Sequence, residues 1–311
     1  MRWYSVKLKI LIVIAIIIAL VLALIGVVVK QNYISERTSS FRVNIATTTS
    51  LYQTGLINDL LENFRDWLRN QTGVNVEFSI LAKGSGEALR LLADGSACIG
   101  FTHAPPLEYQ YMSQGLIERL MIFAYNEFII VGPRSDPAKV SEASDAVDAF
   151  KRIYAAGEKG LAKFVSRGDM SGTNVRELQL WKLAGLNPEG EQWYLKSSQG
   201  MAQTLLMAEN LGAYTLTDKG TYLSLVKQGR LRDLTVLLED PKHLLNVYSI
   251  YISTSPYCSN PEVYFIALKL KIYLSHEGQE LIESRYSGLF NPVDDREEML
   301  LSAWKTLSRL G

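Results

Sequence analysis

The alternation of strand-like and helix-like segments constrains the fold of this chain more than any other feature of its sequence. After Ser40, short apolar runs rich in β-branched residues alternate with segments whose apolar residues recur every three or four positions. This order is typical of a largely parallel sheet with helices on both faces. The sequence therefore predicts an α/β fold, and 311 residues with 48% hydrophobic content are enough for two domains with their own cores.

A break in this pattern predicts two lobes. Strands are expected at 41–46, 74–81, 97–101 and 121–131, with helices around 56–68 and 87–93. Gly132 to Pro137 then marks a crossing into a second unit. The second unit is expected to contain helices near 144–155, 175–184, 201–210 and 220–227, and strands at 162–165, 212–216 and 234–238.

A second crossing completes the arrangement. Residues 245–253 are long, β-branched and aromatic, and they are expected to return the chain to the first unit, which helices near 262–274 and 277–285 complete. The predicted domains are therefore lobe 1, residues 41–131 and 246–311, and lobe 2, residues 132–245. Two crossings predict a hinge, with a mixed, mainly parallel sheet flanked by helices in each lobe.

The N-terminus carries an uninterrupted apolar run from Ile10 to Val29, long enough to cross a bilayer as a helix. Arg2, Lys7 and Lys9 precede it, so the positive-inside rule places residues 1–9 in the cytoplasm and the body outside. We expect residues 10–29 to be a transmembrane anchor and the polar residues 30–40 a tether. The alternative is a cleaved signal peptide and a secreted body, but the run exceeds a usual signal core.

Charge and cysteine content limit the partners. Lys plus Arg and Asp plus Glu both total 32, so no broad basic face is available for nucleic acid. The two cysteines, Cys98 and Cys258, lie in no metal-binding motif, and no metal or cofactor is expected. Outside the cell they could form a disulfide; alternatively each is a small buried apolar residue.

Two hydroxyl- and glycine-rich turns predict an anion site. Thr47 to Ser50 and Ser166 to Thr173 each follow a strand-like run and lead into an amphipathic helix. Such turns gather unpaired N–H groups, hydroxyls and a positive helix end around one point. Arg167 adds a planar fork suited to two oxygens of an oxyanion. The ligand is expected between the lobes, with Lys83 to Gly86 as a third turn.

These motifs, taken together and in order, resemble the tungstate-binding proteins of tungstate ABC importers. The matching residues span about Phe41 to Leu223, and their order makes the resemblance more specific than any one motif. They are Thr47-Thr48-Thr49-Ser50 with Thr54-Gly55-Leu56, His103-Ala104-Pro105, Ser166-Arg167-Gly168-Asp169 with Ser171-Gly172-Thr173, and Ala213-Tyr214-Thr215-Leu216-Thr217-Asp218 with Gly220-Thr221-Tyr222.

The resemblance implies a two-lobed periplasmic-binding-protein-like fold of type II. It also implies capture of tungstate and its delivery to an ABC permease with a cytoplasmic ATPase, by a protein expected to be monomeric. The family's oxyanion role is carried onto Thr48, Thr49, Ser50, Arg167, Ser171 and Thr173. Ser85 and Gly172 complete the expected ligand set, and Lys83, Gly84 and His103 are further candidates.

Each candidate residue also has a structural interpretation. A Thr/Ser run before a helix is commonly an N-cap, and Arg167 could pair with Asp169. Gly84 could serve a tight turn, and His103 could be a hydrogen-bonded structural histidine. The sequence also departs from the family pattern at Lys83, which replaces an apolar residue, at Asn174, where a histidine is common, and at Lys219, which replaces an arginine.

The sequence leaves other ligands and functions open. Molybdate and phosphate are the alternative oxyanions; phosphate keeps a proton at neutral pH and so benefits from a carboxylate acceptor, for which Asp169 and Glu87 are candidates. A membrane-anchored oxyanion sensor is a further alternative. No catalytic residue is expected, because the sequence has no Gly-x-Ser-x-Gly elbow and no metal-ligand cluster.

Overall fold

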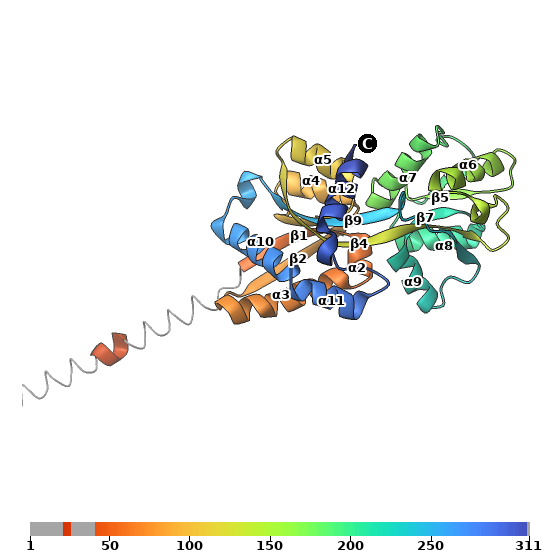
Figure 1. Ribbon diagram of the computed structural model, residues 1–311. Helices are drawn as coiled ribbons and strands as arrows, with labels where there is room; N and C mark the ends of the chain where they lie inside the picture. Colours follow the sequence, from red (N-terminus) through yellow and green to blue (C-terminus); the bar gives the residue numbers. More distant parts are fainter. Residues whose placement is uncertain (1–20, 26–40, 310–311) are drawn as a thin grey trace, which may run out of the picture. The chain divides into compact units, whose positions relative to one another are not determined.

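The computed structural model describes residues 21–25 and 41–309 (Figure 1). Residues 21–25 are helical; the rest of the predicted anchor at 10–29, and the segments predicted at 1–9 and 30–40, lie outside the described residues. Within the described ranges, no helix is both long and apolar enough to span a membrane. The chain divides into two compact units, one of Met1–Arg42 with Arg65–Glu77 and the other of Val43–Phe64 with Phe78–Gly311.

The strands between residues 41 and 309 vary widely in length. They are β1 (Phe41–Thr48), β2 (Val76–Lys83), β3 (Ile99–Thr102), β4 (Ile117–Pro133), β5 (Phe164–Ser166), β6 (Tyr194–Lys196), β7 (Thr215–Asp218), β8 (Leu234–Leu238) and β9 (Leu245–Ser253).

The helices mostly follow strands. They are α2 (Thr49–Gln53), α3 (Leu56–Thr72), α4 (Ser85–Ala93), α5 (Pro105–Ser113), α6 (Ala146–Gly157), α7 (Gly172–Leu183), α8 (Met201–Leu211), α9 (Lys219–Lys227), α10 (Pro261–Leu274), α11 (Glu277–Tyr286) and α12 (Glu297–Ser308). Short 3-10 turns lie at Val140–Glu142, Pro256–Cys258 and Asp294–Arg296.

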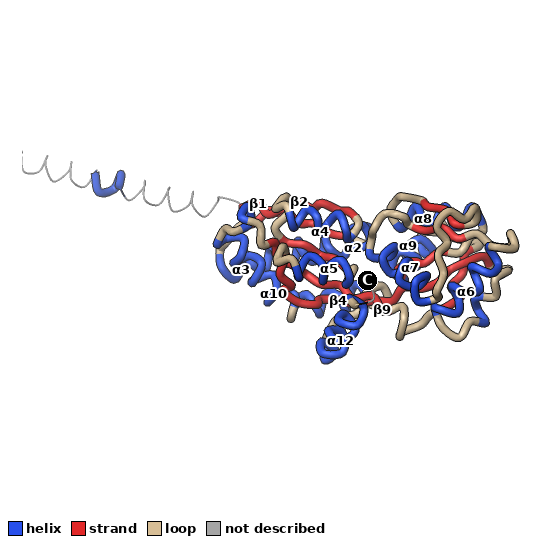
Figure 2. The backbone as a smooth tube through the Cα atoms, turned by 90° about the horizontal axis from the view of Figure 1, so that it is seen from above, coloured by secondary structure: helices blue, strands red, loops and turns tan. Residues whose placement is uncertain are grey.

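The strands of the described residues form a seven-stranded sheet in the order β2-β1-β3-β9-β4-β7, with β8 also pairing with β4, and a separate pair of β5 and β6. β1 pairs parallel with β3, and β5 parallel with β6. However, β9 pairs antiparallel with β3 and β4, and β4 pairs antiparallel with β7 and β8. The predicted mixed sheet is thus confirmed, but its mainly parallel character is wrong, because β4 and β9 run side by side in opposite directions (Figures 1 and 2).

The long strand β4 belongs to two groups of strands. From Ile117 to Glu127 it pairs with β9, and from Phe128 to Pro133 it pairs with β7 and β8. A strand of this length links the strands around β1 and β3 to those around β7 and β8. The lobe boundaries at residues 131/132 and 245/246 remain a prediction, and this pairing is compatible with them.

The apolar spacing predicted the main helices well. The six apolar residues used to predict the helix at 56–68 are all buried in α3. Three helices were missed: the short α2, α5, which begins at Pro105-Pro106, and the C-terminal α12. α5 carries almost no segregation of polar and apolar residues, so periodicity cannot reveal it, and Pro is favoured in the first turn of a helix.

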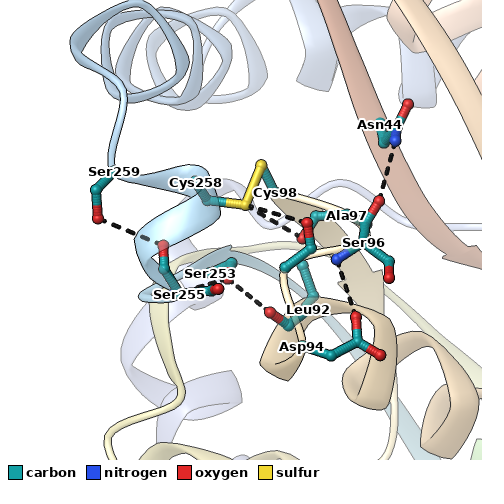
Figure 3. The surroundings of a disulfide bond; sticks show 11 residues. Asn44, Leu92, Asp94, Ser96, Ala97, Cys98, Ser253, Ser255, Cys258 and Ser259 are labelled. Carbon is teal, nitrogen blue, oxygen red and sulfur yellow. Dashed lines mark hydrogen bonds between the residues drawn. A yellow bond between two sulfur atoms is a disulfide. The ribbon is translucent and has the colours of Figure 1, made fainter.

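The two cysteines form a disulfide, Cys98–Cys258, which settles the alternatives left open by the sequence. It joins the residue before β3 to the 3-10 turn after β9, 160 positions later (Figure 3). Around it, the Ser253 hydroxyl donates to the carbonyl of Leu92 at 2.6 Å. The bridge lies at the start of β3, whereas the candidate site described below follows the end of that strand.

Candidate functional site

The first hydroxyl-rich turn lies where β1 meets α2. Thr47, Thr48 and Ser50 are buried, and Thr48 occupies the N-cap position of α2 without a side-chain capping bond. The hydroxyls of Thr48 and Ser50 lie 3.2 Å apart. Those of Thr47 and Thr49 are buried and have no hydrogen-bond partner. Buried hydroxyls normally form hydrogen bonds, so these two are available to donate to an anion.

The second turn precedes α4. Gly84 is its N-cap, no side chain caps this helix, and Ser85 is fully buried. The Ser85 hydroxyl accepts a long hydrogen bond, 3.4 Å, from the backbone N–H of His103, the residue that follows β3. Lys83, a further candidate, is exposed at the end of β2 and is therefore not part of the buried group.

The third turn connects β5 to α7. Ser171 is the N-cap of α7, and its hydroxyl accepts from the backbone N–H of Asn174 at 3.2 Å. Ser171, Thr173 and Arg167 are all buried. Gly168 and Met170 adopt φ angles of +61° and +55°, in the left-handed region. Met170 is unusual in that region, so the turn requires support from its surroundings.

These turns meet in the second compact unit. The N–H of Gly86 donates to the carbonyl of Met170 at 3.2 Å. A Cβ at Gly84 would lie 3.4 Å from the Cα of Ser171, and a Cβ at Gly172 would lie 2.5 Å from the Cε1 of His103. The structure therefore brings Gly84 against Ser171, and His103 against Gly172, while the ligand-binding role of these residues stays a prediction.

Tyr248 on β9 links the β1–α2 turn to this group. The His103 ring stacks on the Tyr248 ring with centroids 4.6 Å apart. The Ser50 side chain lies near enough to the Tyr248 hydroxyl to lower the pKa of that group. Tyr248 is fully buried, and burial raises its pKa well above the ordinary value. Its hydroxyl therefore stays protonated and able to donate.

Arg167 carries the positive charge of the site. Its side chain is 3% exposed, and its Nη2 lies 2.5 Å from the Oδ2 of Asp169. The ion pair with Asp169 that the sequence raised as an alternative therefore exists. However, the Nε of Arg167 is buried and has no hydrogen-bond partner. A buried guanidinium N–H without an acceptor is costly, so one face of this side chain suits an anionic ligand.

His103 is held as a neutral ring. Its Nδ1 lies 2.8 Å from the Oδ1 of Asn246, whose Nδ2 donates to Asn126 and Tyr248. Because Oδ1 is the acceptor of that amide, Nδ1 of His103 carries the proton. Burial lowers the pKa of His103 to about 4, and the charge of Arg167 acts in the same direction. These bonds fit the structural interpretation of His103.

Asp218 is a further buried carboxylate, which the sequence analysis did not name as a candidate. It is fully buried at the N-cap of α9, and its oxygens accept from the N–H and hydroxyl of Thr221 at 2.8–3.0 Å. Burial raises the pKa of Asp218, whereas Thr221 and the charge of Arg167 lower it. Asp218 is the last residue of a motif used for the resemblance. An aspartate three residues before a threonine is typical of a helix N-cap, and this local pattern could have predicted the role of Asp218.

Asn246 and Tyr248 were also missed. Both lie on β9, which was recognised as a connecting strand rather than as part of the site. A buried asparagine in an otherwise apolar strand is the available signal, because a buried amide needs partners. Over residues 21–25 and 41–309, no group of three or more His, Cys, Asp or Glu side chains could hold a metal ion.

The sequence and the fold are similar to those of known proteins. Residues 35–264 match a family model described as a PBP superfamily domain. The tungstate-binding protein TupA of Peptoclostridium acidaminophilum is 37% identical over 209 residues, which cover 66% of this chain and 68% of that protein.

Two solved structures are also similar. The tungstate ABC transporter structure from Geobacter sulfurreducens has 38% identity and a TM-score of 0.64, covering 78% of this chain and 97% of that one. The tungstate-binding protein TupA from Desulfovibrio alaskensis has 33% identity and a TM-score of 0.65, covering 81% and 99%. The chain therefore belongs to the PBP superfamily and, within it, to the family of the TupA proteins.

Proposed function

We propose that this chain is an extracytoplasmic solute-binding protein that captures tungstate between two lobes and delivers it to an ABC permease. The observation that carries the proposal is the Arg167 side chain, which is 3% exposed and leaves its Nε without an acceptor. An oxyanion would supply that acceptor. The function is reversible binding without a covalent step.

The ligand would be held by donors from three turns. The proposed set is Thr48, Thr49, Ser50, Ser85, Arg167, Ser171, Gly172 and Thr173. Each charge-assisted hydrogen bond contributes on the order of 1.5–3 kcal/mol, so a few of them can replace the water around a dianion. The hydrogen bond from Gly86 to Met170 supports a mechanism in which contacts between the turns accompany closure.

The hydrogen bonds of the candidate carboxylates favour a fully deprotonated anion. Asp169 is occupied by Arg167 and by the N–H of Ser171, and Asp218 is occupied by Thr221. Glu87 pairs with Arg90 at 2.7 Å. Phosphate would need one of these oxygens to accept its proton, whereas tungstate and molybdate need donors alone. The names of the TupA relatives favour tungstate of these two.

A thermal-shift comparison tests the proposal. A ligand at one hundred times its Kd stabilises the folded state by about 2.7 kcal/mol, so tungstate should raise the Tm of the purified full-length chain. Phosphate at the same concentration should leave the Tm unchanged. A rise with phosphate but not with tungstate would overturn the assignment of the ligand.

The proposal includes attachment to the outer face of the membrane through residues 10–29. This rests on the apolar run and on the positive residues before it. The test is alkaline extraction of membranes from cells that express the full chain, followed by mass measurement of the product. An anchored protein stays in the membrane pellet at its full mass; release at a lower mass would show that the segment is a cleaved signal.

A further inference from the structure

Two glutamates lie behind the turns of the proposed site and take no direct part in it. Glu108 on α5 and Glu177 on α7 are 0% and 2% exposed. A buried carboxylate is tolerated only where hydrogen bonds satisfy both of its oxygens. Each of these two is surrounded by four protein donors.

The two carboxylate oxygens of Glu177 accept hydrogen bonds from different groups of residues. Its Oε2 accepts from the Ser166 hydroxyl at 2.6 Å and from the Nδ2 of Asn174 at 3.3 Å. Its Oε1 accepts from the Tyr194 hydroxyl at 2.6 Å and from the Nε1 of Trp181 at 3.1 Å. The Oε2 side faces the Arg167 turn, and the Oε1 side faces the aromatic core of residues 164, 181 and 194.

The Oε2 side determines the geometry of the Arg167 turn. Because the Ser166 hydroxyl gives its one hydrogen to Glu177, its oxygen is free to accept from the N–H of Gly168 at 3.2 Å. Asn174 accepts from the N–H of Met170 at 3.1 Å. Ser166 and Asn174 thereby tie Gly168 and Met170, the two residues in left-handed conformations, to one carboxylate.

Glu108 has an equivalent set of partners beside His103. Its Oε1 accepts from the Thr102 hydroxyl at 2.7 Å and from the N–H of Ala104 at 2.9 Å. Its Oε2 accepts from the Tyr251 hydroxyl at 2.8 Å and from the Nε1 of Trp304 at 2.6 Å. Each glutamate thus combines a hydroxyl at a strand end, a tyrosine O–H and a tryptophan N–H, and each holds the residues beside a candidate site residue.

We propose that Glu177 and Glu108 are positioning residues: Glu177 holds the Arg167 turn in the shape that binds the oxyanion, and Glu108 holds the residues beside His103, which packs against Gly172. Neither touches the ligand, and each acts through its hydrogen bonds to the turn. The inference rests on the proposed function for its ligand. The positioning itself is a property of the anion-free protein and can be measured without any ligand.

Glutamine is the informative substitution because it keeps the shape and changes the pattern of donors. On Glu177, one oxygen faces the N–H of Trp181 and the other faces the N–H of Asn174. The amide NH2 of Glu177→Gln must therefore meet a donor in either orientation. The matched control is Trp181→Phe, which removes a donor from the Oε1 side and leaves the Ser166 and Asn174 bonds in place.

The first measurement is amide hydrogen exchange of the Gly168–Thr173 segment in the anion-free full-length protein. Glu177→Gln should raise the exchange rates of the Gly168 and Met170 amides at least tenfold, and Trp181→Phe should leave them within about threefold of the wild type. If Glu177→Gln does not fold, Asn174→Ala replaces it, since this substitution removes the acceptor of the Met170 amide together with the Nδ2 donor to Ser166 and Glu177. Unchanged exchange in the folded variant would overturn the inference.

The second measurement is calorimetric titration of the same variants with tungstate. Glu177→Gln should weaken binding at least tenfold, whereas Trp181→Phe should retain affinity within about threefold even though its Tm falls. Equal losses of affinity in both would assign Glu177 a general structural role and overturn the inference. If the wild type binds no tungstate, the proposed function fails, and the exchange result still decides the positioning role.

Discussion

The Nη2 of Arg167 lies 2.5 Å from the Oδ2 of Asp169, so the turn between β5 and α7 contains its own ion pair. Asp169 also accepts from the N–H of Ser171 at 3.1 Å, which fixes the carboxylate within the turn. The pair therefore holds the guanidinium through Nη2, while its buried Nε has no hydrogen-bond partner. The structural and the ligand-binding interpretations of Arg167 apply to different nitrogens of one side chain.

Replacement of Arg167 tests its part in binding. We expect Arg167→Ala to weaken tungstate binding by at least about 2 kcal/mol, because it removes a charged hydrogen-bond partner. Arg167→Lys should recover only part of this loss, since one ammonium group cannot bind Asp169 and the ligand through separate nitrogens. Calorimetric titration measures both, and circular dichroism checks the fold. Unchanged affinity in Arg167→Ala would remove Arg167 from the site.

The close contact between Gly172 and His103 predicts that a side chain at position 172 would clash with His103. A Cβ at Gly172 would lie 2.5 Å from the Cε1 of His103 and 2.7 Å from its carbonyl oxygen, so Gly172→Ala must push the two turns apart. A Cβ at Gly84 would meet Ser171 at an ordinary 3.4 Å. We therefore expect Gly172→Ala to weaken tungstate binding at least tenfold and Gly84→Ala to have little effect. Equal affinities of the two variants would contradict the closed geometry of the site.

Much of this site could be predicted from the sequence because its turns are local structures. Thr47 to Ser50 and Ser166 to Thr173 each contain the strand end, the hydroxyls and the helix start that form a donor-rich turn. Asp218 had a local capping signal with Thr221 that was not used, whereas Asn246 and Tyr248 were missed because they reach the site through pairing of strands far apart in the chain. Local spacing carries no information on such pairing.

The directions of the strands in the sheet also could not be predicted from local sequence. Alternating strands and helices predicted a mainly parallel sheet, but the two connecting strands, β4 and β9, pair antiparallel over most of their length. Their apolar sequences indicate burial, not direction. The burial of Glu108 and Glu177 also could not be predicted, because a glutamate in a helix is ordinarily exposed and its neighbours in the sequence do not indicate otherwise.

The protonation of His103 gives a prediction for pH. Burial lowers its pKa to about 4 from 6.5, so the ring is neutral in the folded state while an unfolded chain binds a proton between these values. The contribution of His103 to stability is therefore complete above pH 6.5 and falls as the pH drops towards 4, by up to about 1.4 kcal/mol per unit. NMR titration of the His103 ring should give a midpoint well below 5; a midpoint above 6 would contradict its burial as a neutral ring.

Removal of the disulfide should lower the stability of the protein without a matching loss of tungstate affinity. Cys98–Cys258 closes a loop of 160 positions, for which the chain-entropy model gives a stabilisation of about 5 kcal/mol. Reduction, or the double substitution Cys98→Ser and Cys258→Ser, should lower the Tm markedly. Tungstate affinity should change by less than threefold, because the bridge lies at the opposite end of β3 from His103. A large loss of affinity at a temperature where the variant is folded would show coupling between the two.

The most direct test of the account is calorimetric titration of the purified full-length chain with tungstate, molybdate, sulfate and phosphate in turn. We predict tight binding of tungstate and weak binding of phosphate, because the candidate site offers buried donors, among them the Nε of Arg167, while Asp169 and Asp218 are already hydrogen-bonded. The molybdate result then measures how far the site separates two oxyanions of equal charge and shape. Tight phosphate binding with no tungstate binding would contradict the account and would make a carboxylate of the site the acceptor of the phosphate proton.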